Sequence, residues 1–242
     1  MKKPEIHIGC AGYNNSYWKG IFYPEGLPRS KWFGYYCMQF PMYEMNGTFY
    51  KFPSVKSLEN TYNKTPENYR LTVKAPRVIT HFKKFAGCQQ EIADFYTACR
   101  EGLKDKLDSA LFQLPPSFHY TSERLEMITT SLSKDFKNVV EFRHASWWIP
   151  EVFEALAKNS IIFCSVSYPN LPEGVIKTSP IGYIRLHGRP KLFYSGYSDA
   201  ELQQLYDDIL VKGFSEVTVC FNNTASERGI LDAMAMKKIS KF

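Results

Sequence analysis

The feature that most constrains this chain is the alternation of short strand-like runs with longer helical patterns along its whole length. Strands alternating with helices form parallel sheets, and eight such units close a barrel. The pattern therefore predicts an α/β fold, a single (βα)8 TIM-type barrel, with an open flavodoxin-like sheet as the alternative. The eight expected strands are 6–10, 42–46, 70–74, 110–114, 139–143, 161–166, 183–187 and 217–222.

Helical patterns fill most intervals between these strands. Ser54 is a capping residue, the stretch 89–103 carries an apolar stripe, and Pro150 is suited to a helix start. The interval 169–180 holds three prolines and a glycine, so the sixth helix is expected to be short or missing. No linker interrupts the pattern, which predicts one domain over residues 1–242. Further helices are expected to begin at 121 and to cover 199–210 and 225–238.

Composition narrows the class of protein. The chain has 242 residues, 44% of them hydrophobic, which is enough for one large core. Its net charge of +6 falls short of the clustered basic stripe of a dedicated nucleic-acid binder. The six cysteines form no CxxC pair and indicate buried thiols in a reducing compartment. No apolar stretch has the length of a signal peptide or a membrane span, so we expect a cytoplasmic protein without membrane contact.

Strand periodicity predicts which side chains point into the barrel. Residues i and i+2 share a face of a strand, and the helix-covered face must be apolar. In the fifth strand Val140 and Phe142 belong to that face, so Glu141 and Arg143 point inward. The same alternation assigns further inward side chains: Glu44, Asn46, Thr72, Lys74, Gln113, Arg185, His187, Thr218, Cys220 and Asn222.

These inward polar residues stand near the C-terminal ends of their strands, where active sites of such barrels lie. We expect Glu44 or Glu141 to act as a catalytic base and His187 as an acid. Inward cations outnumber the two glutamates, which favours a ligand carrying a carboxylate or phosphate. These cations are Lys74, Arg143 and Arg185.

The alternative is an internal network of ion pairs, with Glu141 bonded to Arg143 or Arg185, that only holds the barrel together. Cutting one partner of a buried pair costs about 3–5 kcal/mol. A pair facing a wet, ligand-accessible pocket should lose only about 1 kcal/mol, and this smaller loss is expected for Glu141→Gln and Arg185→Met.

Residues in the loops after the strands complete the expected binding site. The histidines and the asparagine among them are His81, His144 and Asn223; the aromatic residues are Tyr13, Trp18 and Trp147. Aromatic side chains here either pack as a lid or stack on a base or sugar. A divalent metal could bind Glu44, Glu141, His144 and His187. The nearby cations oppose this, and no HxH or HExxH spacing supports it, so we expect no cofactor.

Several motifs resemble those of the YecE-like family, domain of unknown function 72 (DUF 72). They run through almost the whole chain in order, at 8–13, 18–24, 43–50, 73–81, 111–118, 140–147, 185–189 and 221–223. The resemblance implies a (βα)8 barrel and a polar site built from these motif residues, and it supplies no reaction. One departure is visible, because Tyr168 precedes Pro169 where many relatives carry an Asp.

Three functions remain open on this basis. The first is an acid–base enzyme, such as a hydrolase, lyase or isomerase, acting on a small anionic or phosphorylated molecule. The second is a metal-dependent phosphodiesterase or other nucleic-acid-processing enzyme, which rests on fold analogy and positive charge. The third is a non-catalytic protein that binds its ligand in the same pocket.

Overall fold

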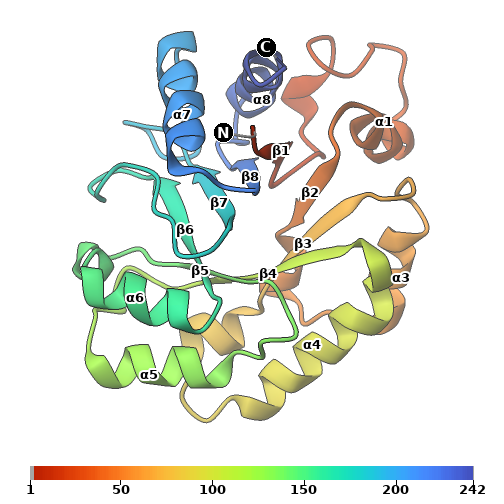
Figure 1. The fold of residues 1–242 in the computed structure, drawn as a ribbon. Helices are drawn as coiled ribbons and strands as arrows, with labels where there is room; N and C mark the ends of the chain where they lie inside the picture. The colour runs from red at the N-terminus through yellow and green to blue at the C-terminus, as the bar shows by residue number, and fades with distance from the viewer. Residues whose placement is uncertain (1–2, 242) are drawn as a thin grey trace. The chain divides into compact units, whose positions relative to one another are not determined.

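Eight parallel strands form a closed barrel in chain order, β1 to β8, in the computed structural model, which describes residues 3–241 (Figure 1). This confirms the predicted fold class. The strands are β1 (Glu5–Cys10), β2 (Met42–Met45), β3 (Arg70–Lys74), β4 (Leu107–Gln113), β5 (Asn138–Glu141), β6 (Ile162–Ser167), β7 (Ile181–Leu186) and β8 (Glu216–Phe221).

The α-helices are α1 (Trp32–Gln39), α2 (Gly47–Tyr50), α3 (Val55–Tyr62), α4 (Gln89–Leu103), α5 (Ser122–Ser131), α6 (Pro150–Lys158), α7 (Asp199–Lys212) and α8 (Arg228–Ile239). The described stretch between β6 and β7 contains no helix, as its prolines predict. Helix α1 was not expected, because its aromatic-rich sequence lacks the strong helix formers that mark a helix in a sequence.

Several strands end earlier than the pattern predicts. Strand β5 ends at Glu141 and β7 at Leu186, so Arg143 and His187 lie one or two residues beyond the regular pairing. Asn46 and Asn222 likewise follow β2 and β8. These polar side chains therefore lie in the turns that follow the strands. There the backbone no longer makes regular hydrogen bonds to both neighbouring strands.

The backbone contacts divide into two compact units, which are described separately. The first contains the residues up to Glu44, Ser165–Val175 and the residues from Pro180 onward. Within it β8 pairs in parallel with β1 and β7, and helix α8 packs against β1 and β8 (Figure 1). Helix α7 begins with a capping box between Ser198 and Glu201. It ends at Lys212 and is followed by Gly213, whose φ of +63° suits a left-handed cap.

The second unit contains Met45–Cys164 and Ile176–Ser179. Strand β4 pairs in parallel with β3 and β5, with Val73 opposite Ala110 and Phe112 opposite Val140. Helix α4 buries the apolar stripe that the sequence predicts, and its Phe95 packs edge-on against Phe112 at 5.8 Å. That residues 1–242 form one domain stays a prediction.

The predicted alternation of faces is confirmed where side-chain contacts define it. Phe142 is fully buried and stacks on Trp147 at 4.1 Å, on the side that carries α6. Its neighbour Glu141 instead contacts the Cys164 thiol from the other face of the sheet. All six cysteines lie in the described part of the chain, are buried and form no disulfide. Among the described helices, none combines the length and apolar character needed to cross a membrane.

Candidate functional site

In the first unit, Glu44 and Arg185 form a fully buried ion pair. The Arg185 guanidinium donates from Nη2 to Glu44 Oε1 at 2.5 Å and from Nε to Oε2 at 2.9 Å. The Tyr183 hydroxyl donates to the same Oε2 at 3.0 Å. Neither Glu44 nor Arg185 has exposed surface. Both carboxylate oxygens are thus engaged, which makes Glu44 better suited to holding strands together than to accepting a proton.

Two cysteine thiols of the same unit are buried away from water. Burial raises the pKa of the Cys220 thiol well above its usual value, and the adjacent Glu44 carboxylate adds to the rise. Burial likewise raises the pKa of the Cys10 thiol. Neither thiol is suited to act as a nucleophile, because the thiolate is the reactive form.

His187 and Asn222 lie together just past the ends of β7 and β8. The Asn222 amide nitrogen is 2.9 Å from His187 Nδ1, and because an amide nitrogen can only donate, the neutral ring carries its proton on Nε2. The His187 ring is fully buried and meets Tyr168 edge-on at 5.6 Å. The sequence placed both residues at the ends of neighbouring strands, and the structure brings them into contact.

Asn223, expected to bind a ligand, instead links the β7–α7 loop to α8. Its amide nitrogen donates to the Ser195 carbonyl at 3.0 Å and to Asp232 Oδ2 at 2.7 Å. The Tyr197 backbone N–H donates to the same Asp232 oxygen at 3.2 Å. Burial raises the pKa of Asp232 to about 6, against the opposing effect of the bond from Asn223. No sequence signal distinguishes Asp232, because it lies in the middle of a helical pattern.

A polar pocket of ≈ 430 Å³ in the first unit follows β1. Tyr13 lines it and packs against Tyr43 at 5.3 Å. Arg29 also lines it and donates from Nε to Asn14 Oδ1 at 2.7 Å, and Asn15 bonds the backbone carbonyl of Thr224. Sequence reasoning selected Tyr13 but missed Arg29 and the two asparagines, because they lie in a loop without periodicity.

Two of the expected aromatic binding residues belong to the core. Trp18 is fully buried and donates from Nε1 to the Ser226 carbonyl at 3.0 Å. Trp147 is also fully buried, between Phe142 and Phe118. Of the two interpretations of these aromatic stretches, this burial favours packing over stacking on a ligand.

In the second unit, charged side chains and one amide gather at the C-terminal ends of β3, β4 and β5. Arg143 donates from Nε to Glu141 Oε1, and both side chains are buried. Gln113, opposite Glu141 in the ladder, donates to the Leu114 carbonyl at 2.7 Å. Lys74 ends β3, is only half-buried, and places its ammonium 4.2 Å from the centre of the Phe49 ring.

His81 joins this cluster from the turn after β3. Its ring meets Phe49 edge-on at 4.8 Å, and its Nδ1 lies 2.9 Å from the Thr80 hydroxyl. Partial burial, followed by the charges of Lys74, Arg143 and Lys84, lowers the pKa of His81 to about 4. The imidazole is therefore neutral at pH 7, and both burial and the surrounding positive charge oppose its protonation. We call Lys74, His81, Glu141 and Arg143 the cationic cluster.

The last two expected residues lie elsewhere. His144 stacks on His119 with 3.8 Å between ring centres, and its Nδ1 lies 2.8 Å from the Ser146 hydroxyl. Asn46 is half-buried between β2 and α2. No group of three or more His, Cys, Asp or Glu side chains within residues 3–241 is arranged to hold a metal ion.

A closed (βα)8 barrel with polar side chains at its C-terminal strand ends defines a class that hosts many chemistries. The particular family follows from comparison with known proteins. A sequence model of the family described as "Protein of unknown function DUF72" matches residues 7–241, so the chain belongs to the DUF72 family. This confirms the resemblance found in the sequence motifs.

Solved structures and a curated relative agree with this assignment. A crystal structure of a DUF72 family protein (TM1631) from Thermotoga maritima is 29% identical, with a TM-score of 0.88, and the match covers 98% of this chain and 100% of that one. A DUF72 family protein (ef0366) from Enterococcus faecalis has the same fold, with 20% identity, a TM-score of 0.85, and coverage of 98% and 96%. The UPF0759 protein YunF of Bacillus subtilis is 25% identical over 77% of this chain and 71% of its own length.

Proposed function

We propose that this protein is an acid–base enzyme acting on a small molecule that carries a carboxylate or phosphate, bound at the cationic cluster. The observation that carries the proposal is the state of His81. Partial burial lowers the pKa of its ring to about 4, together with the positive charges of Lys74, Arg143 and Lys84. A bound anion would neutralise that charge, so the cluster is electrostatically complementary to an anionic ligand.

The same electrostatics suggest which group moves the proton. In the ligand-free protein His81 is neutral and can accept a proton, although its low pKa makes it a weak base. An anion beside Lys74 and Arg143 would raise the pKa of His81 toward neutrality, where general acid–base catalysis is most efficient. Glu141 would keep the Arg143 guanidinium in place through the bond to its Nε. The catalytic roles expected for Glu44 and His187, which belong to the first unit, stay predictions.

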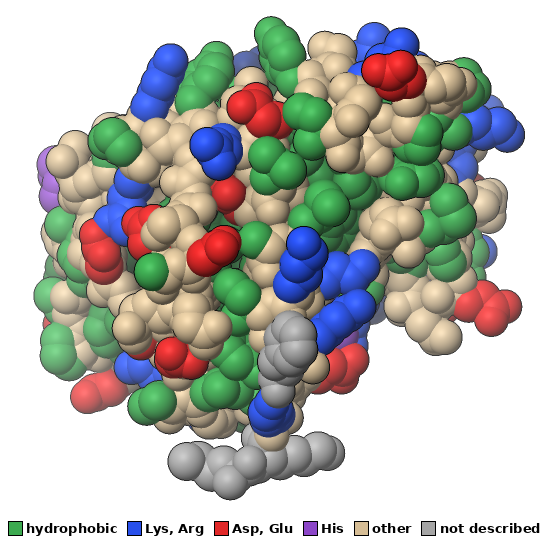
Figure 2. Space-filling model, turned by 90° about the horizontal axis from the view of Figure 1, so that it is seen from above, with side chains coloured by type: hydrophobic (Ala, Val, Ile, Leu, Met, Phe, Trp, Pro, Cys, Tyr) green, Lys and Arg blue, Asp and Glu red, His purple; other side chains and the backbone are tan. Residues whose placement is uncertain are grey.

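The two other functions have less support. A non-catalytic binder would use the same cluster, and only a measurement of turnover separates it from an enzyme. For a metal-dependent phosphodiesterase or nucleic-acid-processing enzyme, no observation in the described residues is specific. On the face drawn in Figure 2, basic side chains are mixed with acidic and apolar ones, which is unlike the basic stripe of a nucleic-acid binder.

Anion binding can be tested directly by calorimetry with phosphate, sulfate and malonate, using glycerol and glucose as neutral ligands. We expect the anions to bind and the neutral ligands not to bind. Lys74→Met should weaken anion binding about tenfold, because it removes one charge-assisted hydrogen bond. Lys56→Met is the matched control, since Lys56 is an exposed lysine on α3 of the same unit.

Equal affinity for anions and neutral ligands would contradict the proposal, and so would equal losses in the two lysine variants. Once anion binding is established, turnover of phosphorylated and carboxylated metabolites separates enzyme from binder. His81→Gln should then abolish turnover while leaving anion affinity within about threefold, because a neutral ring contributes little charge to binding.

A further inference from the structure

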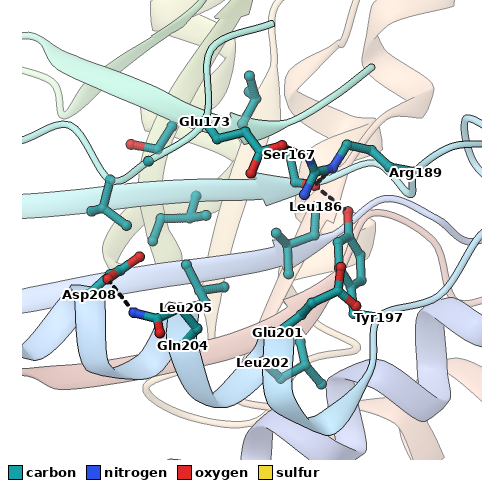
Figure 3. A pocket seen from close by; sticks show the side chains of 15 residues that line it. Ser167, Glu173, Leu186, Arg189, Tyr197, Glu201, Leu202, Gln204, Leu205 and Asp208 are labelled. Carbon is teal, nitrogen blue, oxygen red and sulfur yellow. Dashed lines mark hydrogen bonds and ion pairs between the residues drawn. The ribbon is translucent and has the colours of Figure 1, made fainter. Parts of the chain in front are cut away.

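A second cavity, of ≈ 180 Å³, lies in the first unit (Figure 3). It is lined by β6, β7 and α7, together with the connection after β6 that contains no helix. In barrels of this kind a helix ordinarily covers the outer face of each strand. Here a loop through Glu173 and Val175 takes that place and leaves a hollow over Ile184 and Leu186.

Helix α7 gives this cavity an ordered wall. Glu201, Leu205 and Asp208 all line it, and their spacing of i, i+4 and i+7 puts them on one face of the helix. At about 1.5 Å per residue the two carboxylates stand about 10 Å apart along the axis. Figure 3 shows Leu205 between Glu201 and Asp208, with Leu202 beside Glu201. In chain order the cavity residues of the helix are Glu201, Leu202, Gln204, Leu205 and Asp208, so two acids flank two leucines and a glutamine.

The charges of the lining residues are unbalanced. Three carboxylates and one guanidinium line the cavity, a formal charge of −2, although the whole chain carries +6. The guanidinium of Arg189 is already engaged, because it pairs with Glu173 and donates from Nε to the Ser167 hydroxyl at 3.0 Å. Arg189 therefore pairs directly with Glu173 in the connection after β6. The pKa of Glu201 is lowered mainly by the bonds from Ser198, and the charge of Arg189 adds to this effect.

The two acids of α7 that line the cavity, Glu201 and Asp208, are each bonded to the protein through one carboxylate oxygen. Glu201 accepts from the Ser198 backbone N–H and from its hydroxyl, both at 2.8 Å, through Oε2. Asp208 accepts from the Gln204 amide at 2.9 Å through Oδ1. Glu201 Oε1 and Asp208 Oδ2 remain for a ligand, while the other oxygens fix the orientation of each carboxylate.

We propose that this cavity binds a linear aliphatic amine with ammonium groups at both ends, about 10 Å apart. One ammonium would bind Glu201 beside the Tyr197 ring, and the other would bind Asp208. The methylene chain between them would cover Leu202 and Leu205, which supply the apolar contact. The site is independent of the proposed catalytic function, because it shares no residue with the cationic cluster.

The test is calorimetry on the full chain with three ligands of equal length: the linear eight-carbon diamine, the eight-carbon monoamine and the eight-carbon diol. We expect the diamine to bind about fivefold more tightly than the monoamine, since one further half-exposed ion pair forms. The diol should bind more weakly than either amine. Lys74→Met should leave all three affinities unchanged.

Helix α7 provides a matched pair of variants. Asp207 and Asp208 each accept a hydrogen bond from the glutamine four residues before, at 3.0 and 2.9 Å, but only Asp208 lines the cavity. Asp208→Asn should weaken diamine binding about fivefold, and Asp207→Asn should leave it unchanged. A diol that binds as well as the diamine, equal losses in both variants, or no binding of the diamine would each overturn the proposal.

Discussion

Two buried carboxylate–guanidinium pairs within residues 3–241 differ in the charge that surrounds them. The Glu44–Arg185 pair is balanced, with one carboxylate, one guanidinium and a tyrosine hydroxyl that together satisfy both carboxylate oxygens. The Glu141–Arg143 pair has Lys74 nearby, and the pKa of His81 is lowered by burial and by the charges of Lys74 and Arg143. Both pairs are buried, so burial alone does not distinguish them.

This difference indicates how a candidate ligand site can be recognised. Buried charge is not sufficient, and an excess of one sign of charge is the more informative feature. A balanced pair needs no further partner, and hydrophobic residues of equal volume could often replace it without loss of stability. A surplus of cations held together by the fold is an unfavourable arrangement until an anion arrives. Such unfavourable arrangements are typical of functional sites.

The largest expected effect is on the balanced pair. Arg185→Met leaves the Glu44 carboxylate buried with only the Tyr183 hydroxyl from this network, and should lower the free energy of unfolding by about 3–5 kcal/mol. The sequence alone predicted a smaller loss of stability for this variant, about 1 kcal/mol. The larger value is expected because Arg185 has no exposed surface. Urea midpoints at constant slope measure the change.

Two further variants sharpen this result. The double variant Glu44→Met with Arg185→Met should recover most of the loss, since no uncompensated charge remains. Arg100→Met, which removes one partner of an exposed pair with Asp135, should cost about 0.5 kcal/mol or less. A small loss in Arg185→Met, equal to that of Arg100→Met, would contradict a structural role for the balanced pair.

Asp232 extends the comparison to a buried carboxylate held by N–H donors in place of a guanidinium. Its pKa rises from 3.8 to about 6, so between these values the folded state binds more protons than the unfolded state. Its contribution to stability is therefore present below pH 4 and lost as the pH rises through 6. Asp232→Asn lacks this titration. The free energy of unfolding of the variant should therefore rise by about 2–3 kcal/mol relative to that of the parent chain between pH 4 and pH 7. A pH-independent difference in unfolding free energy would show that Asp232 has an ordinary pKa.

The smallest expected effect is on the cationic cluster. Lys74→Met removes a contact with the Phe49 ring but also relieves repulsion from Arg143, so stability should change by about 1 kcal/mol or less. The same variant should raise the pKa of His81, because Lys74 is one of the charges that lower it. A loss as large as that of Arg185→Met would mean that Lys74 is a structural residue.

The fold could be predicted because its signals are local and repeated. Strand β3 has the predicted bounds, and the prolines between β6 and β7 identified the missing helix. The alternation of faces placed Glu141 and Phe142 on opposite sides, as their contacts with Cys164 and Trp147 show. Periodicity is imposed by backbone geometry, so a single sequence carries it.

The candidate site could be predicted only in part, because partners are set by tertiary structure. The sequence placed Glu44 and Arg185 on inward faces, yet it could not show that Tyr183 completes their network. Trp18 was taken for a binding residue, although packing among aromatic neighbours buries it fully. Arg29 lies in a loop whose path no periodicity defines. Residue type and strand position predict where a polar group stands, whereas its partner depends on distances that only the fold fixes.

The most direct test of the central claim is the titration of His81 by NMR, with and without saturating phosphate. Without phosphate we expect a pKa of about 4, held down by burial and by the charges of Lys74 and Arg143. With phosphate the pKa should rise by about one unit or more, because a nearby anion favours the protonated ring. An unchanged pKa in saturating phosphate, or a ligand-free value near 6.5, would contradict the account of the cationic cluster as an anion site.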